Sequence, residues 1–188
     1  MHPQQLNGSL ERARRQAGYN LVEVLVAMAV LGVILLSIVT LFFIGRRNVH
    51  SGKQLTAANA IATRVLEDLA LMSATDVIDN FKLAGSTMAA NTVGNVSYPG
   101  SVLRDTRAAI SATTNDPSGY LARWKTLVDS DTELNEGRIV LVVTPLEPRV
   151  TNDPIRTAQV LRLRGVIEWR EGVRRRNVAF DASKLQRP

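Results

Sequence analysis

The sequence predicts an α+β fold, in which a long N-terminal helix is followed by an antiparallel sheet that packs on the second half of that helix. Three observations predict it. Residues 21–44 form a long apolar stretch with one acidic residue, residues 53–72 repeat apolar side chains with a helical period, and residues 158–181 alternate as a strand pair around a Glu-Gly turn. The chain of 188 residues is long enough for one domain and an anchor.

The apolar stretch from Leu21 to Ile44 is long enough to cross a membrane. As a helix it would extend roughly 36 Å, more than the hydrocarbon thickness of a bilayer. It follows a leader, residues 1–18, that contains Arg12, Arg14 and Arg15. Basic residues stay preferentially in the cytoplasm, so the part of the chain after the apolar stretch is expected outside it. The stretch contains one acid, Glu23, and a carboxylate at this depth is costly without a partner.

The residues around this acid resemble a known signal. Gly18, an aromatic residue at Tyr19, and Glu23 before a long apolar tail are similar to the class III signal of type IV pilins and type II secretion pseudopilins. The resemblance implies that prepilin peptidase cuts between Gly18 and Tyr19 and that Tyr19 becomes the N-methylated first residue. It leaves 19–45 as a transmembrane and filament-core helix. The usual first residue is phenylalanine, and Tyr19 keeps its ring.

The same resemblance gives Glu23 a role in subunit assembly. In a filament the apolar helices bundle in a core of low dielectric constant, where attraction between opposite charges is strong. We expect Glu23 to form an ion pair with the cationic terminal amine of Tyr19, either of a neighbouring subunit or of the same subunit. An ordinary signal anchor with an interfacial glutamate is the plainer alternative.

The chain is most like a minor pilin of the PilV class. Residues 19–98 contain no proline, whereas major pilins usually have one midway along this helix, and there is no cysteine for a C-terminal disulfide loop. The implied function is a minor pilin subunit of a type IV pilus that acts in assembly initiation or at the tip, in adhesion, motility or DNA uptake. The alternatives are a pseudopilin of a type II secretion system and a single-pass anchored periplasmic binding protein.

The resemblance also implies partners and a location. The partners are other pilin and minor pilin subunits, prepilin peptidase and the inner-membrane assembly platform. The location is the inner membrane, crossed once with the C-terminal domain in the periplasm, and then the pilus or pseudopilus.

Residues 46–188 form the predicted periplasmic domain, with an amphipathic helix over 46–75, a variable loop region over 76–135 and an antiparallel sheet over 136–183. The apolar stripe of the helix is Leu55, Ala58, Ala62, Val65, Leu66, Leu69 and Met72. Arg64, Glu67 and Asp68 fall off this stripe. Within the variable region, residues 84–119 are predicted as a long loop that leaves room for short helical or strand pieces. Residues 120–128 are predicted as a helix with Leu121, Trp124 and Val128 on its packing face.

The sheet prediction rests on three runs. Residues 138–144 are β-branched and end at Pro145. Residues 158–169 alternate between an apolar face and an outer face with Arg162, Arg164 and Glu168, and residues 173–181 return. With Glu171 and Gly172 as the turn centre, Glu168 would face Arg175 and Gly165 would face Val178.

The formal net charge is +6, and its basic residues gather near the C-terminus. The candidate basic patch is Arg162, Arg164, Arg174, Arg175 and Arg176, which could contact DNA, an anionic surface or an acidic subunit. The strand alternation explains the same arginines as a solvated outer face. We favour that interpretation over DNA binding, since no aromatic residues interleave with the arginines.

Enzyme chemistry has no support in the sequence. There is no glycine-rich phosphate loop, no Ser/His/Asp set and no metal-ligand spacing, and the two histidines are far apart. We therefore expect no enzymatic activity, no cofactor and no metal site.

Overall fold

The computed structural model describes residues 4–111, 113, 115–148 and 153–186, with side chains described from Leu21 onward. The chain divides into two compact units, Met1–His50 and Ser51–Pro188. Helix α1, Gln4–Leu71, supplies the described structure of the first unit and the first element of the second. The part of α1 from Leu21 is long and apolar enough to cross a membrane.

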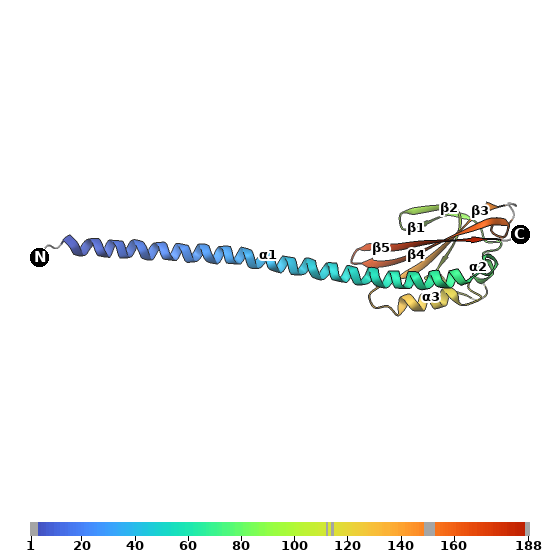
Figure 1. Ribbon diagram of the computed structural model, residues 1–188, viewed down its shortest axis with the longest axis horizontal. Helices are drawn as coiled ribbons and strands as arrows, with labels where there is room; N and C mark the ends of the chain where they lie inside the picture. Colours follow the sequence, from blue (N-terminus) through green and yellow to red (C-terminus); the bar gives the residue numbers. More distant parts are fainter. Residues whose placement is uncertain (1–3, 112, 114, 149–152, 187–188) are drawn as a thin grey trace. The chain divides into compact units, whose positions relative to one another are not determined.

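An antiparallel sheet is the centre of the second unit. In the described part of the chain its strands follow chain order, β1-β2-β3-β4-β5 (Figure 1). They are β1 (Ala89–Val93), β2 (Val96–Asp105), β3 (Arg138–Pro148), β4 (Ala158–Glu171) and β5 (Arg174–Leu185). Three shorter helices are α2 (Ala74–Asn80), α3 (Tyr120–Asp129) and α4 (Pro154–Thr157). The result is the expected α+β architecture, consistent with a pilin fold.

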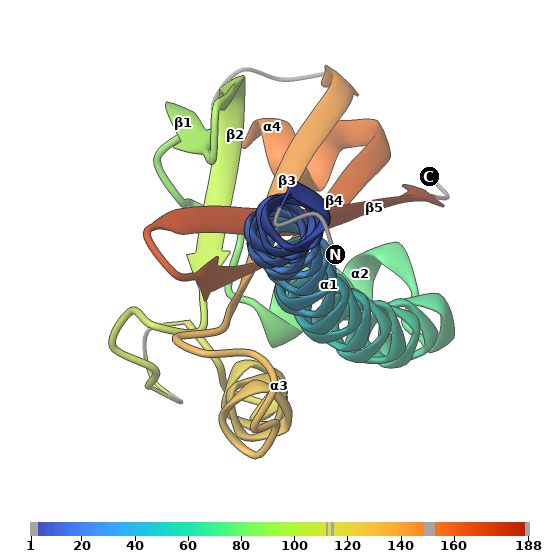
Figure 2. The same cartoon turned by 90° about the vertical axis from the view of Figure 1, so that its left-hand side faces the viewer.

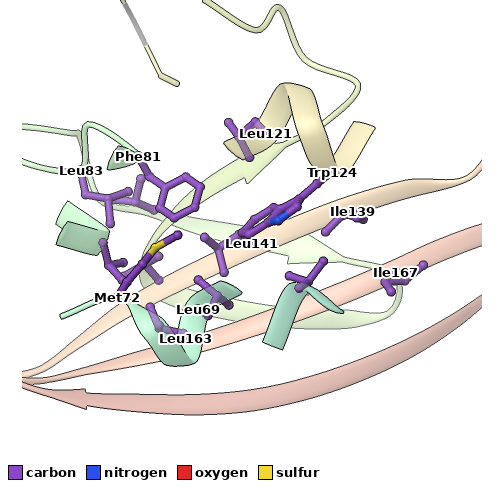
Figure 3. Close-up of a cluster of buried hydrophobic side chains, with 14 of the residues drawn as sticks. Leu69, Met72, Phe81, Leu83, Leu121, Trp124, Ile139, Leu141, Leu163 and Ile167 are labelled. Carbon is purple, nitrogen blue, oxygen red and sulfur yellow. The ribbon is translucent and has the colours of Figure 1, made fainter. Parts of the chain in front are cut away.

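The main core lies between one face of the sheet and the helices. From Ala58 to Leu69, α1 buries an apolar stripe against the inward side chains of β3 and β4, and Met72 continues it just beyond the helix (Figure 3). Helix α3 lies beside this part of α1 (Figure 2) and packs through Trp124. Trp124 and Phe81 are fully buried, with ring centroids 5.3 Å apart. The stripe therefore holds the unit together by burial of apolar surface.

The β1–β2 hairpin covers part of the opposite face. It buries Val93 against Val140, Val142 and Val166 in a second, smaller cluster. At its tip, Gly94 has φ +59°, and a Cβ there would lie 3.0 Å from the Asn177 amide nitrogen. The hairpin tip therefore lies directly on the outer face of β5.

The helical predictions for this unit are confirmed in part. Leu121, Trp124 and Val128 are the buried face of α3, and Trp124 is a packing residue as expected. The helix expected over 46–75 is two helices, since α1 ends at Leu71 and Ser73 starts α2 with a capping box. The position of Asp68 off the stripe was wrong. Asp68 is only 8% exposed, and its buried carboxylate accepts a hydrogen bond from the Trp124 indole.

Residues 84–119, predicted as a long loop with short helical or strand pieces within it, contain β1 and β2. The sheet therefore begins at residue 89, well before the expected range of 136–183. Strand β3 continues beyond Pro145, which lies opposite Leu161 in the ladder to β4. Proline has no N–H for the ladder but does not have to end a strand when its neighbours keep the pairing.

The β4–β5 register differs from the prediction by two residues. Glu168 lies opposite Asn177 and Gly165 opposite Phe180, because the turn residues are Gly172 and Val173. Gly172 has φ +61°, whereas Val173 does not have positive φ. A positive φ at the first central residue alone is the pattern of a type II′ hairpin turn, which places glycine first.

Candidate functional site

The apolar side chains of the first unit have no cover from the protein. Every side chain from residue 21 to residue 50 is exposed, and those of Leu41 and Phe42 reach 75% and 70%. Monomeric soluble proteins rarely expose apolar patches beyond a few hundred Å². This surface therefore requires lipid or other apolar helices around it.

The hydroxyl groups in this stretch are already satisfied within the helix. Ser37 Oγ donates to the carbonyl of Val33 at 2.8 Å, and Thr40 Oγ1 donates to the carbonyl of Leu36 at 2.9 Å. Such bonds to the preceding turn allow Ser and Thr to enter an apolar environment without an unpaired donor.

Glu23 differs from these hydroxyls. Its side chain is exposed on α1, and it forms no hydrogen bond or ion pair with any residue whose side chain the structure describes. A carboxylate within an apolar helix must stay at the interface, become neutral or find a cation. The helix thus presents one acidic group to whatever surrounds it.

Gly18 and Tyr19 lie within the backbone of α1, but their side chains are outside the described residues. Cleavage between them and methylation of Tyr19 stay predictions of the sequence.

The candidate basic patch is divided between two places in the second unit. Arg162 and Arg164 lie on the outer face of β4 and share Asp181 of β5, at 3.6 and 3.4 Å. Arg174, Arg175 and Arg176 follow the β4–β5 turn. Six residues separate Arg175 from Asp181 along β5, which corresponds to roughly 20 Å in a strand. The five arginines do not form one surface.

Acids also reduce the charge at the turn. Arg176 Nε lies 2.8 Å from Glu171 Oε2, and Arg175 Nη1 lies 3.9 Å from the buried Glu168. Arg174 has no ion pair with any described residue. Most of the arginines thus belong to local ion pairs, as expected for a solvated sheet face.

No sequence pattern indicated the residues that β2 brings close to this face. Arg164 lies with its guanidinium 5.7 Å from the centroid of the Tyr98 ring. Tyr98 was inside the expected loop, where residues were too polar and glycine-rich to indicate a strand. Tyr98 lies opposite Asn91 in the β1–β2 hairpin, which covers this face of the sheet.

No group of three His, Asp or Glu side chains in the described part of the chain is arranged to hold a metal ion.

One family model matches the chain. Residues 13–39 match the prokaryotic N-terminal methylation motif, a segment that contains Gly18, Tyr19 and Glu23. No curated protein and no solved structure matches the chain. The motif supports a type IV pilin-like or pseudopilin-like protein with a prepilin-type signal. Such a signal implies processing by prepilin peptidase, membrane anchoring by the apolar helix and assembly with pilin subunits, and proteins of this kind are generally structural.

Proposed function

We propose that the chain is a minor pilin of a type IV pilus, of the PilV class, that acts in assembly initiation or at the pilus tip. The observation that carries the proposal is the exposed apolar surface from residue 21 to residue 44, which follows the glycine of a methylation motif. A helix of this kind has two stable surroundings, the bilayer before assembly and a bundle of like helices after it. The absence of proline from residues 19–98 supports a minor rather than a major subunit.

In this proposal, cleavage after Gly18 creates the charge that Glu23 requires. The new terminal amine of Tyr19 is cationic, and it lies four residues from Glu23 in the chain. Between neighbouring subunits the pair sets the axial register of the helices, because one misplaced turn would leave both charges unpaired in an apolar core. Attraction between them grows as the dielectric constant falls.

The first experiment is mass spectrometry of the mature amino terminus, after expression with prepilin peptidase. A methylated Tyr19 at the terminus is the expected result. A mature chain that starts beyond Ile44 would lack the apolar helix and contradict the proposal.

The second experiment is incorporation into sheared pili. Glu23→Gln and Glu23→Leu should insert into the membrane normally but be depleted from the pilus fraction. Glu67→Gln is the matched control, because its side chain is exposed on α1 with only the surface pair to Arg64. Copurification with a type II secretion complex, and not with pili, would favour the pseudopilin alternative.

Orientation needs a separate test. The chain has no cysteine, so Ser183→Cys provides a single thiol at an exposed position of β5. A membrane-impermeant maleimide added to spheroplasts should label it if the second unit is periplasmic.

A further inference from the structure

A pocket opens on the outer face of the sheet, away from α1. Its volume is about 350 Å³, and it lies between the start of β2, the end of β3 and the middle of β4. The side chains that line it include Ser97, Tyr98, Thr144, Leu146, Arg162 and Arg164. The size corresponds to the small end of ligand pockets, enough for a group of about one amino-acid residue.

The charges around the pocket do not balance. Asp181 is the acid that faces the two arginines, and it pairs with Arg162 Nη2 at 3.6 Å and with Arg164 Nη1 at 3.4 Å. Both distances exceed the 2.7–2.9 Å typical of a charge-assisted hydrogen bond. One carboxylate is thus shared by two guanidinium groups. Its single negative charge compensates one of the two positive charges and leaves the other on the pocket wall.

Arg164 also has an unused donor. Its Nε is shielded from solvent and has no hydrogen-bond partner in the part of the chain that the structure describes. A buried donor without a partner is uncommon in folded proteins and unfavourable. The guanidinium is held near the Tyr98 ring by a cation–π contact. When the Arg164 side chain turns toward the pocket, a planar anion that accepts from Nε and from the neighbouring Nη would complete a bidentate contact.

The remaining walls have a mixed character. Tyr98 and Leu146 provide apolar surface, while Thr144 and Ser97 carry hydroxyl groups. Thr144 lies directly opposite Arg162 in the β3–β4 ladder, so its side chain and the arginine share one face. The anionic part of a ligand would thus lie beside an apolar part.

We propose that this pocket binds a single carboxylate carried on an apolar or aromatic body of about one residue in size. A carboxylate carries one negative charge, which matches the one uncompensated guanidinium. A phosphate monoester carries about −1.5 to −2 at pH 7 and would add repulsion from Asp181. The carboxylate belongs either to a free small acid or to an acidic residue of a protein segment.

The test follows the arginine Nε–H signals of the full chain by NMR, in non-ionic detergent micelles with ¹⁵N-labelled arginine. The free-acid arm uses N-acetyl-phenylalanine, with N-acetyl-phenylalaninamide as its uncharged match. The protein-segment arm uses a capped pentapeptide with a central glutamate, and the same peptide with glutamine as its match. At least one acid should shift the Arg164 signal in a saturable way, and neither uncharged match should. The arm that binds identifies the source.

Variants check the location. Arg162→Gln and Thr144→Val should each weaken binding at the Arg164 signal. Arg164→Gln should weaken binding about tenfold or more, because a bidentate contact is lost, and in this variant the Arg162 signal reports binding. Arg64→Gln is the matched control on the exposed surface of α1 and should leave binding unchanged. Since Arg162 is 55% exposed, its variant tests the pocket even if the Arg164 variant does not fold.

Three results would overturn the proposal. They are no saturable shift with either acid, equal binding of the acids and their uncharged matches, and inorganic phosphate that binds Arg164 as tightly as the acids do.

Discussion

The indole Nε1 of Trp124 donates a hydrogen bond of 2.9 Å to Oδ2 of Asp68, which joins α3 to α1 within the second unit. Arg123 forms an ion pair with the same carboxylate oxygen. Trp124 is fully buried, and its ring packs against Phe81, so the indole N–H has no access to water. A single acid of α1 thus satisfies both a buried donor and a charge of α3.

We expect Asp68→Ala to lower the free energy of unfolding by about 1–3 kcal/mol, the usual cost of leaving a buried donor unpaired. Asp68→Asn should cost less, since its amide oxygen can still accept from the indole. Urea denaturation of the full chain in detergent, followed by tryptophan fluorescence, measures both. Glu67→Ala is the control on the exposed side of the same turn, where a change within about 0.5 kcal/mol is expected. Equal losses for Ala and Asn at Asp68 would contradict the role of the hydrogen bond.

Gly165 provides the second test. It lies opposite Phe180 in the β4–β5 ladder, and a Cβ at this glycine would overlap the phenyl ring. Gly165→Ala should destabilise the unit by about 1–3 kcal/mol, as overpacking does in other cores. Phe180→Ala added to it should recover part of the loss, because it removes the atoms that clash.

The control for this glycine is Gly52→Ala. Gly52 is within α1 and a Cβ there meets no atom within 4 Å, so alanine should be neutral or stabilise by up to about 1 kcal/mol. Chemical denaturation of Gly165→Ala, Phe180→Ala, the double variant and Gly52→Ala measures these changes in the free energy of unfolding. Additive effects of Gly165→Ala and Phe180→Ala would contradict the proposed overlap.

Sequence patterns predicted the elements whose apolar residues repeat with a clear period. The stripe from Ala58 to Met72 and the buried face of α3 were found in this way, as was the inward face of β4. The β1–β2 hairpin was predicted only as a loop with short strand pieces, because its strands are mostly polar and bury just Val93, Ser101 and Val102 among the described residues. The position of the hairpin over β4 and β5 depends on tertiary contacts, which the period of apolar residues in the sequence does not reveal.

Some residues of the candidate site could likewise be predicted from the sequence and others could not. Glu23 could be picked out because one acid in an apolar run is conspicuous, whereas the grouping of arginines depended on the hairpin register. A turn centred on Gly172 and Val173 gives Arg164 the partner Asp181 and leaves Arg174 beyond the acids that pair with its neighbours. The pocket beside Tyr98 could not be predicted at all, since it needs β2, β3 and β4 together.

Glu168 is the centre of a buried ionic cluster on the outer face. It is 2% exposed, and its Oε2 lies 2.6 Å from Arg138 Nη2, while Asp105 pairs with the same arginine at 2.8 Å. Burial alone would lower the pKa of Arg138, but hydrogen bonds and charges from Glu168 and Asp105 outweigh it, so the pKa lies above its ordinary value.

Removal of this acid should be costly, because it leaves Arg138 partly unpaired beneath the hairpin. We expect Glu168→Ala to lower the free energy of unfolding by about 3–5 kcal/mol. Glu136→Ala removes an acid of the exposed pair with Arg170 and should cost about 0–1 kcal/mol. The comparison uses urea midpoints of the two variants in the same detergent. Similar losses of stability for the two variants would show that the buried ion pair of Glu168 contributes no more to stability than the exposed pair of Glu136.

The last prediction concerns acid. The carboxylate of Asp76 accepts a hydrogen bond from the Ser73 backbone N–H at 2.8 Å, and Ser73 Oγ accepts from the Asp76 N–H at 3.1 Å. Hydrogen bonds from the side chain and the backbone N–H of Ser73 to this carboxylate lower the pKa of Asp76 below its ordinary value. The ionised form is therefore favoured more in the folded state than in the unfolded one. Its contribution to stability is complete above the unfolded pKa and is lost as the pH falls through the folded pKa.

Asp76→Asn should therefore lower the urea midpoint at neutral pH, and the difference from the unsubstituted chain should shrink once the pH falls below about 4. Thr63→Ala removes an exposed hydroxyl that bonds only within its own helix, so its effect on the midpoint should be the same at every pH. Urea titrations from neutral to acidic pH compare the three chains. A constant difference for Asp76→Asn down to the most acidic point would mean that the capping box works equally well with a neutral side chain, and that α2 does not depend on this charge.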